Sequence, residues 1–120
     1  MPRILTVDDS AAMRQMVELT LTSAGYDVSQ ATNGREALDI AGKEGFDLVI
    51  TDVNMPQMDG ITLVRELRGL PAYRHIPLLV LTTEATAERK VEGREAGATG
   101  WLVKPFNPDR LLATVAKVLK

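Results

Sequence analysis

The sequence predicts an α/β domain of (βα)5 type, a doubly wound sheet of five parallel strands, and three observations carry this prediction. First, five short apolar segments are spaced along the chain, each too short for a helix. Second, the stretches between them repeat apolar residues at three- and four-residue steps, which is typical of amphipathic helices. Third, residues 24–28 and 44–48 are near-copies of one helix-to-strand turn. Such alternation favours a parallel sheet with right-handed crossovers.

The predicted strands are the segments 4–7, 28–31, 48–50, 78–81 and 102–103. Several of them are apolar on both pleat faces, as expected when helices cover both sides of a parallel sheet. The longest purely apolar run is residues 78–81, which is far shorter than a membrane span. We therefore expect buried strands rather than membrane segments.

Helical spacing of apolar side chains is clearest over residues 13–24 and 111–119. Asn107 followed by Pro108 predicts the start of the last helix, as N-cap and first helical residue. Three glycines are predicted to end helices in the left-handed conformation: Gly25, Gly45 and Gly97.

The helix predicted over residues 86–96 is the weakest element. It contains Gly93, which costs about 1 kcal/mol relative to alanine in a helix interior. It also carries two like-charge pairs at four-residue spacing, Glu88/Glu92 and Lys90/Arg94. A helix of low stability suits a face that shifts between two states. A charged helix that is simply exposed to solvent explains the same residues equally well.

Composition narrows the function classes. The chain of 120 residues fits one domain, and we expect that domain to span residues 1–120 without an output domain. Its 14 basic and 16 acidic residues provide no basic patch of the kind that binds nucleic acid. No cysteine is present and no signal peptide is recognisable, so we expect a soluble, cytoplasmic monomer without membrane insertion.

Polar residues follow four of the predicted strands. Asp8 and Asp9 follow the first strand, Asp52 the third, Thr82 the fourth and Lys104 the fifth. The carboxyl ends of parallel strands lie along one edge of the sheet, where open α/β folds bind their ligands. We therefore expect three carboxylates, a hydroxyl and an ammonium group to lie close together.

Each residue also has a purely structural explanation. Asp9 or Ser10 fits the N-cap of the first helix. Asp52 fits the start of a turn before a proline, and Lys104 fits a solvated lysine after a strand.

The combination of these residues is harder to explain structurally, because three crowded carboxylates repel one another without a cation. Oxygen ligands favour Mg²⁺, with Mn²⁺ as a possible substitute. A carboxylate can accept a phosphoryl group, whose oxygens a lysine and a hydroxyl can bind.

One set of residues and short motifs extends over most of the chain: Asp8-Asp9, Asp52, Met55-Pro56, Met58-Asp59-Gly60, Thr82 and Lys104-Pro105-Phe106. With these residues the chain resembles the response-regulator receiver family along essentially its whole length. Within the family it is most similar to the stand-alone chemotaxis regulators. The resemblance implies the strand order 2-1-3-4-5 of flavodoxin-like sheets. It also implies a cis peptide bond between Lys104 and Pro105.

The resemblance assigns the metal site residue by residue. Asp52 is expected to be the phosphoacceptor and, together with Asp9, to ligate Mg²⁺ directly. Asp8 is expected to act through a water molecule, and Asn54 to offer its backbone carbonyl.

The resemblance also assigns the residues around the phosphoryl group. Thr82 and Lys104 are expected to bind its oxygens, while Asn54 and Glu84 tune its removal by water. Trp101 stands where most relatives have tyrosine or phenylalanine. Indole is larger and can only donate a hydrogen bond, so Trp101 fits either a two-position switch or a packed aromatic residue.

We therefore expect a signalling switch rather than an enzyme with a separate substrate. The implied donor is a histidine kinase of the CheA-like type or its phosphotransfer domain, and the implied target is a protein such as the flagellar motor switch. The phosphoryl group would alter the face formed by the fourth helix, fifth strand and fifth helix. A phosphate sink or relay remains an alternative. A Mg²⁺-dependent aspartyl phosphohydrolase fits less well, because its Asp-x-Asp signature has Asn54 as the second member here.

Overall fold

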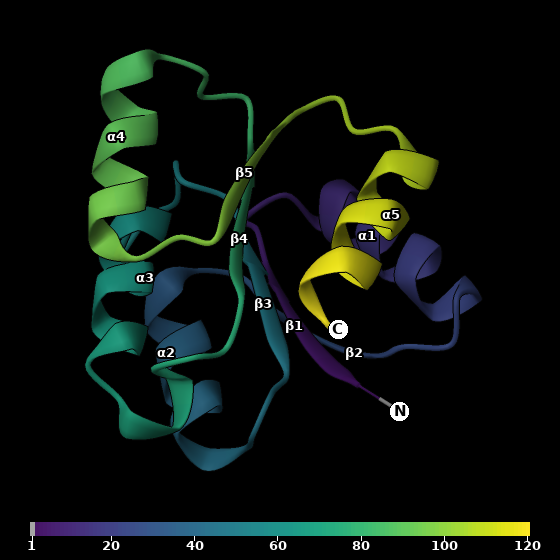
Figure 1. Ribbon diagram of the computed structural model, residues 1–120, viewed down its shortest axis with the longest axis horizontal. Helices are drawn as coiled ribbons and strands as arrows, with labels where there is room; N and C mark the ends of the chain where they lie inside the picture. Colours follow the sequence, from purple (N-terminus) through teal and green to yellow (C-terminus); the bar gives the residue numbers. More distant parts are fainter. Residues whose placement is uncertain (1) are drawn as a thin grey trace.

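Five parallel strands form one sheet in the order β2-β1-β3-β4-β5, which confirms the order implied by the resemblance (Figure 1). The computed structural model describes residues 2–120. The strands are β1 (Arg3–Val7), β2 (Asp27–Ala31), β3 (Leu48–Thr51), β4 (Leu78–Thr82) and β5 (Gly100–Val103). Each contains its predicted segment and extends it by one or two residues, so the α/β prediction is confirmed.

Helices cover both faces of the sheet (Figure 1). They are α1 (Ala11–Ser23), α2 (Gly34–Lys43), α3 (Gly60–Arg68), α4 (Ala87–Ala96) and α5 (Pro108–Val118), with a 3-10 turn η1 (Pro71–Tyr73). Helices α1 and α5 lie on one face, and α2, α3 and α4 lie on the other. Within residues 2–120, no helix has both the length and the apolar character needed to cross a membrane.

The strand pleat divides the core into two layers. Leu5 and Val80 belong to the cluster beneath α2, α3 and α4, whereas their neighbours Ile4 and Leu81 belong to the cluster beneath α1 and α5. Successive side chains of a strand point to opposite faces, so strands that are apolar at every position fill both layers. This is why the continuous apolar segments 48–50 and 78–81 predicted β3 and β4 correctly.

A polar side chain caps the start of each α-helix. In every case its oxygen accepts a hydrogen bond from the backbone N–H three residues later. The capping residues are Ser10, Asn33, Asp59, Thr86 and Asn107. Asn107 confirms its predicted role. Ser10 rather than Asp9 caps α1, and the Asp9 carboxylate is therefore not used by the helix.

Two of the three predicted left-handed glycines are confirmed. Gly25 has a φ of 93° and Gly97 a φ of 115°. The prediction for Gly45 is wrong, because α2 ends with Glu44 in an extended conformation, at φ −127° and ψ 148°. The last turn of α2 has tertiary partners instead. The Tyr73 hydroxyl lies 2.8 Å from the carbonyl oxygens of both Ala41 and Glu44.

Candidate functional site

Three carboxylates lie together at the carboxyl ends of β1 and β3, which are neighbours in the sheet. Asp8 and Asp9 follow β1, and Asp52 follows β3. Each offers an oxygen atom, and these oxygens all lie within 4.8 Å of one another. Asp8 and Asp52 are buried, whereas Asp9 is exposed. The predicted convergence of these residues is confirmed.

Lys104 bridges the two buried carboxylates. Its Nζ lies 2.7 Å from Asp8 Oδ2 and 2.9 Å from Asp52 Oδ2. Burial alone would lower the pKa of Lys104, but the two hydrogen bonds and the adjacent negative charges outweigh it and raise that pKa. The bond between Lys104 and Pro105 is cis, as the resemblance implied. The lysine is therefore held between both acids.

The backbone binds the other oxygen of each buried acid. Ser10 N–H donates to Asp8 Oδ1 at 2.9 Å, and Val53 N–H donates to Asp52 Oδ1 at 2.6 Å. The Asp52 bond is to the N–H of the next residue, so it does not test the prediction that Asp52 starts a turn before the proline. Within residues 2–120, the Asp9 carboxylate has no hydrogen-bonding partner, so it remains available to a ligand at the exposed side of the site.

The donor set fits a hard divalent cation. Three carboxylates face one ammonium group, and negative charge stays in excess at the rim. The ligand atoms are oxygens, which suits Mg²⁺ and does not favour a softer metal. Asn54 lies exposed in the loop after Asp52, where its carbonyl could complete such a site.

Thr82 and Glu84 form the turn that follows β4. Thr82 is fully buried, and its Oγ1 accepts a hydrogen bond from Glu84 N–H at 3.1 Å. The Glu84 carboxylate accepts one from the Thr86 hydroxyl at 3.0 Å. Because β4 pairs with β3, this turn lies on the same rim as Asp52.

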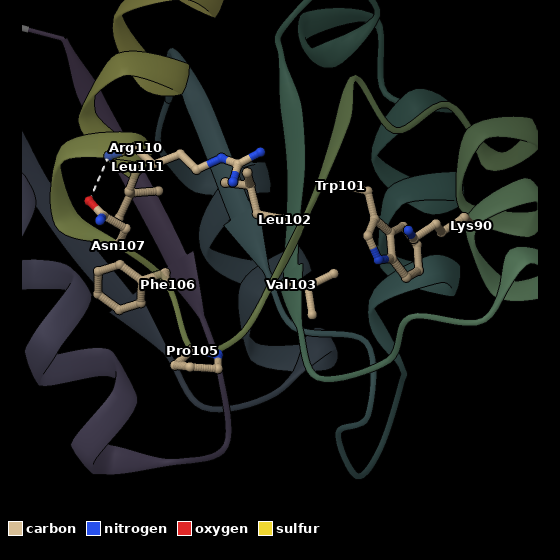
Figure 2. A pocket seen from close by; sticks show the side chains of 9 residues that line it. All are labelled: Lys90, Trp101, Leu102, Val103, Pro105, Phe106, Asn107, Arg110 and Leu111. Atoms are coloured by element: carbon tan, nitrogen blue, oxygen red, sulfur yellow. Dashed lines mark hydrogen bonds between the residues drawn. The ribbon is translucent and has the colours of Figure 1, made fainter.

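Trp101 is joined to the same turn. Its indole Nε1–H donates to the Glu84 carbonyl oxygen at 3.0 Å. Figure 2 shows the indole on the α4 side of β5 beside Lys90, while Leu102 and Phe106 lie on the α5 side. The residues drawn there line an open groove of about 370 Å³. The sequence suggested roles for Trp101 and Glu84 separately but gave no sign of their contact.

Two further residues support the site without a role assigned from the sequence. Arg14 of α1 donates from Nη1 to the Asp8 carbonyl at 2.7 Å and from Nε to Gln30 Oε1 at 3.1 Å. Gly60 supports the acceptor from below, since a Cβ there would lie 1.9 Å from the Asp52 carbonyl oxygen. Asp59-Gly60 was recognisable as a motif, but no signal in the sequence indicated the role of Arg14.

Comparisons with known proteins agree with this geometry. Residues 4–116 match the family described as the response regulator receiver domain. Response regulator MprA of Mycolicibacterium vanbaalenii is 41% identical over 118 residues, which are 98% of this chain and 50% of that protein. Chemotaxis protein CheY-3 of Vibrio cholerae is 39% identical over 119 residues, 98% of this chain and 92% of that protein. The chain thus spans about half the length of one relative and nearly all of the other.

Solved structures are similar over the whole fold. The chemotaxis response regulator CheY4 of Vibrio cholerae has 53% identity and a TM-score of 0.93, with 98% of each chain covered. The receiver domain of sensor histidine kinase PA1611 from Pseudomonas aeruginosa has 28% identity and a TM-score of 0.92, with 98% of this chain and 97% of that chain covered. That structure is described with a magnesium ion coordinated in its active-site cleft.

Proposed function

Because the chain belongs to the response regulator receiver family, we propose that it is a phosphoacceptor switch of a two-component system, with Asp52 as the acceptor. One observation carries the choice of residue. Asp52 is the carboxylate that lies at the centre of the rim, with Lys104 on Oδ2 and two further acids within reach of a shared cation. Asp8 is equally buried and its oxygens are bound in the same way as those of Asp52, by a backbone N–H and Lys104, so bonding does not separate the two acids. Asp52 is preferred because it follows β3, the central strand of the sheet, between the acids after β1 and Thr82 of β4.

Four residues of the rim would bind Mg²⁺ in three different ways. Asp9 and Asp52 would ligate it directly, Asp8 through water, and Asn54 through its backbone carbonyl. Bound there, the cation supplies positive charge that neutralises the acids and the phosphoryl oxygens. The exposed position of Asp9 supports its role, since a ligand can reach it without displacing a protein partner.

Phosphoryl transfer then depends on three side chains. An Asp52 oxygen attacks phosphorus, forming a P–O bond as the P–N bond of a donor phosphohistidine breaks, and the leaving imidazole keeps a proton. Lys104 exchanges its contact with Asp52 Oδ2 for a phosphoryl oxygen. The Thr82 hydroxyl donates a hydrogen bond to another phosphoryl oxygen and keeps its proton. Asn54 and Glu84 flank the site and would limit how water reaches the phosphoryl group.

The donor is a histidine kinase of the CheA-like type or its phosphotransfer domain. The output face is formed by α4, β5 and α5, where Lys90 and Arg110 line the groove (Figure 2). The similarity to chemotaxis proteins of nearly the same length supports a separate target protein, such as the flagellar motor switch.

Intact-mass measurement after incubation with acetyl phosphate and Mg²⁺ tests the assignment. The wild-type protein should gain one phosphoryl group, and both a chelator and Asp52→Asn should abolish the gain. Asp39→Asn, which changes an exposed acid of α2, should leave it intact. Incorporation into Asp52→Asn at the wild-type rate would show that another residue is the acceptor.

A further inference from the structure

Gly93 lies inside α4 at a position where the helix itself gives no reason for glycine. It is buried, and glycine weakens a helix interior. A Cβ at this position would lie 2.6 Å from Cζ3 of Trp101 and 3.1 Å from Cε3. Gly93 therefore leaves a notch in α4 that the six-membered ring of the indole occupies.

The opposite edge of the indole is also fixed. Trp101 Nε1–H donates to the Glu84 carbonyl oxygen at 3.0 Å, and an indole has no other hydrogen-bonding group. The ring is thus held between the notch at Gly93 and the turn after β4. A side chain restrained at both edges is seated rather than free to rotate.

The turn after β4 also orients the Thr82 hydroxyl. Glu84 N–H donates to Thr82 Oγ1 at 3.1 Å and occupies one of its lone pairs. A hydroxyl has one hydrogen and two lone pairs, so the Thr82 hydrogen stays available for another acceptor. Donors that are oriented before reaction stabilise developing charge without reorganisation.

We propose that Gly93 is a positioning residue for phosphoryl transfer, acting through Trp101 and Glu84 on the Thr82 hydroxyl. This inference rests on the proposed function, because it assigns Thr82 to the phosphoryl group. The seated indole holds the Glu84 peptide units, and these keep the Thr82 proton directed at the rim. The smallest residue of α4 is in this way linked to the chemistry on Asp52.

The notch is tested first without Mg²⁺ or phosphodonor, by thermal unfolding and Trp101 emission. Gly42→Ala is the matched control, because a Cβ on this exposed α2 residue meets nothing within 4 Å. It should raise Tm, since alanine favours the helix. Gly93→Ala should instead lower Tm and shift Trp101 emission as the indole is displaced. In a Trp101→Phe background, where the shorter ring leaves room, Gly93→Ala should raise Tm as the control does.

A rise in Tm for Gly93→Ala with unchanged emission would overturn the notch. Tm and Trp101 emission test the notch independently of phosphorylation. If neither the wild type nor any variant accepts a phosphoryl group, the proposed function is overturned, and with it the assignment of Gly93 to phosphoryl transfer.

The link to Thr82 is tested with acetyl phosphate at saturating Mg²⁺. Thr82→Ala should slow phosphorylation about 100-fold, the scale for losing one oriented donor. Gly93→Ala should slow phosphorylation by a smaller factor. The Mg²⁺ Kd should not change, because Asp9 does not belong to the series of contacts that joins Gly93 to Thr82. Gly93→Ala added to Thr82→Ala should slow it no further, since both act on one hydroxyl.

Two outcomes of this test would overturn the proposal. One is a wild-type rate for Gly93→Ala despite displaced indole emission. The other is an additive loss in the variant that combines Gly93→Ala with Thr82→Ala, which would indicate general damage to the fold. If Gly93→Ala does not fold, Trp101→Phe replaces it. That substitution leaves α4 intact, removes the donor to Glu84, and should slow phosphorylation at unchanged Mg²⁺ Kd.

Discussion

The two ends of the sheet treat charged and polar side chains in opposite ways. At the carboxyl ends of the strands, three acids face one lysine, and negative charge remains in excess. At the amino ends, Arg68 and Tyr73 bond to backbone carbonyls that no reaction changes. A bound cation can neutralise the excess negative charge at the carboxyl ends. At the amino ends, Arg68 and Tyr73 already have hydrogen-bonding partners within the protein.

Arg68 shows how the amino-terminal end is completed. Its guanidinium donates to the Gly97 carbonyl at 2.8 and 3.0 Å and to the carbonyls of Tyr73 and Ile76 at 2.7 Å. These bonds join the connection after α3 to the connection after α4. Burial lowers the pKa of Arg68, although an arginine stays charged at any ordinary pH. The amino ends of the strands therefore stabilise the fold, whereas the carboxyl ends keep charged side chains available to a ligand.

Arg68→Ala tests most directly whether the amino ends of the strands affect stability without affecting phosphorylation. It removes several charge-assisted hydrogen bonds and leaves carbonyls without partners, so unfolding free energy should fall by about 3 kcal/mol. Urea titration measures the loss. The rate of phosphorylation by acetyl phosphate in the remaining folded protein should not change. Arg65→Ala, an exposed arginine of the same helix, should stay within about 0.5 kcal/mol of wild type. A slowed phosphorylation rate in Arg68→Ala would mean that the two ends are not separate.

At the rim, Asp9→Ala should separate stability from ligand binding. Mg²⁺ at a hundredfold excess over Kd should stabilise the wild type by about 2.7 kcal/mol, seen as a rise in Tm. Removing one acid should raise Tm without metal, because repulsion decreases, and should greatly reduce the Mg²⁺ response. Asp39→Ala should leave both quantities unchanged. An undiminished Mg²⁺ response in Asp9→Ala would exclude it as a ligand.

The smallest expected effect concerns Tyr73→Phe at the stabilising end. Losing the hydroxyl that reaches Ala41 and Glu44 should cost about 1 kcal/mol at neutral pH. Burial raises the pKa of Tyr73 above its ordinary value of about 10. The neutral phenol therefore stabilises the fold fully below that value, and this contribution is lost as pH rises through the raised pKa. Tm measured against pH should thus fall less steeply above pH 10 in Tyr73→Phe.

The other tyrosine provides the control for this effect. Within residues 2–120, the Tyr26 hydroxyl has no hydrogen-bonding partner, so Tyr26→Phe should cost little at neutral pH. Equal losses in Tyr26→Phe and Tyr73→Phe would show that the tertiary cap of α2 contributes nothing measurable.

The fold could be predicted largely because its signals are local. A strand buried on both faces is rich in apolar residues on both pleat faces, and β1, β3 and β4 show this directly in the sequence, each with a single buried threonine. Gly25 and Gly97 end helices by their own backbone conformation, which neighbouring residues determine. Gly45 was predicted wrongly because the end of α2 is satisfied by Tyr73, a residue far away in the sequence.

The candidate site divides in the same way. The residue types at the strand ends can be read from the sequence, and parallel strands place Asp8, Asp52 and Lys104 along one edge of the sheet, although β4 lies between β3 and β5. The bonds of Lys104 to both acids and of Arg14 to Asp8 could not be read from the sequence. The same holds for the fit of Trp101 against Gly93. Periodicity and helix caps depend on residues a few positions apart, so a linear sequence records them. Contacts between side chains of different elements depend on how those elements pack, and packing is fixed only when the whole core is assembled.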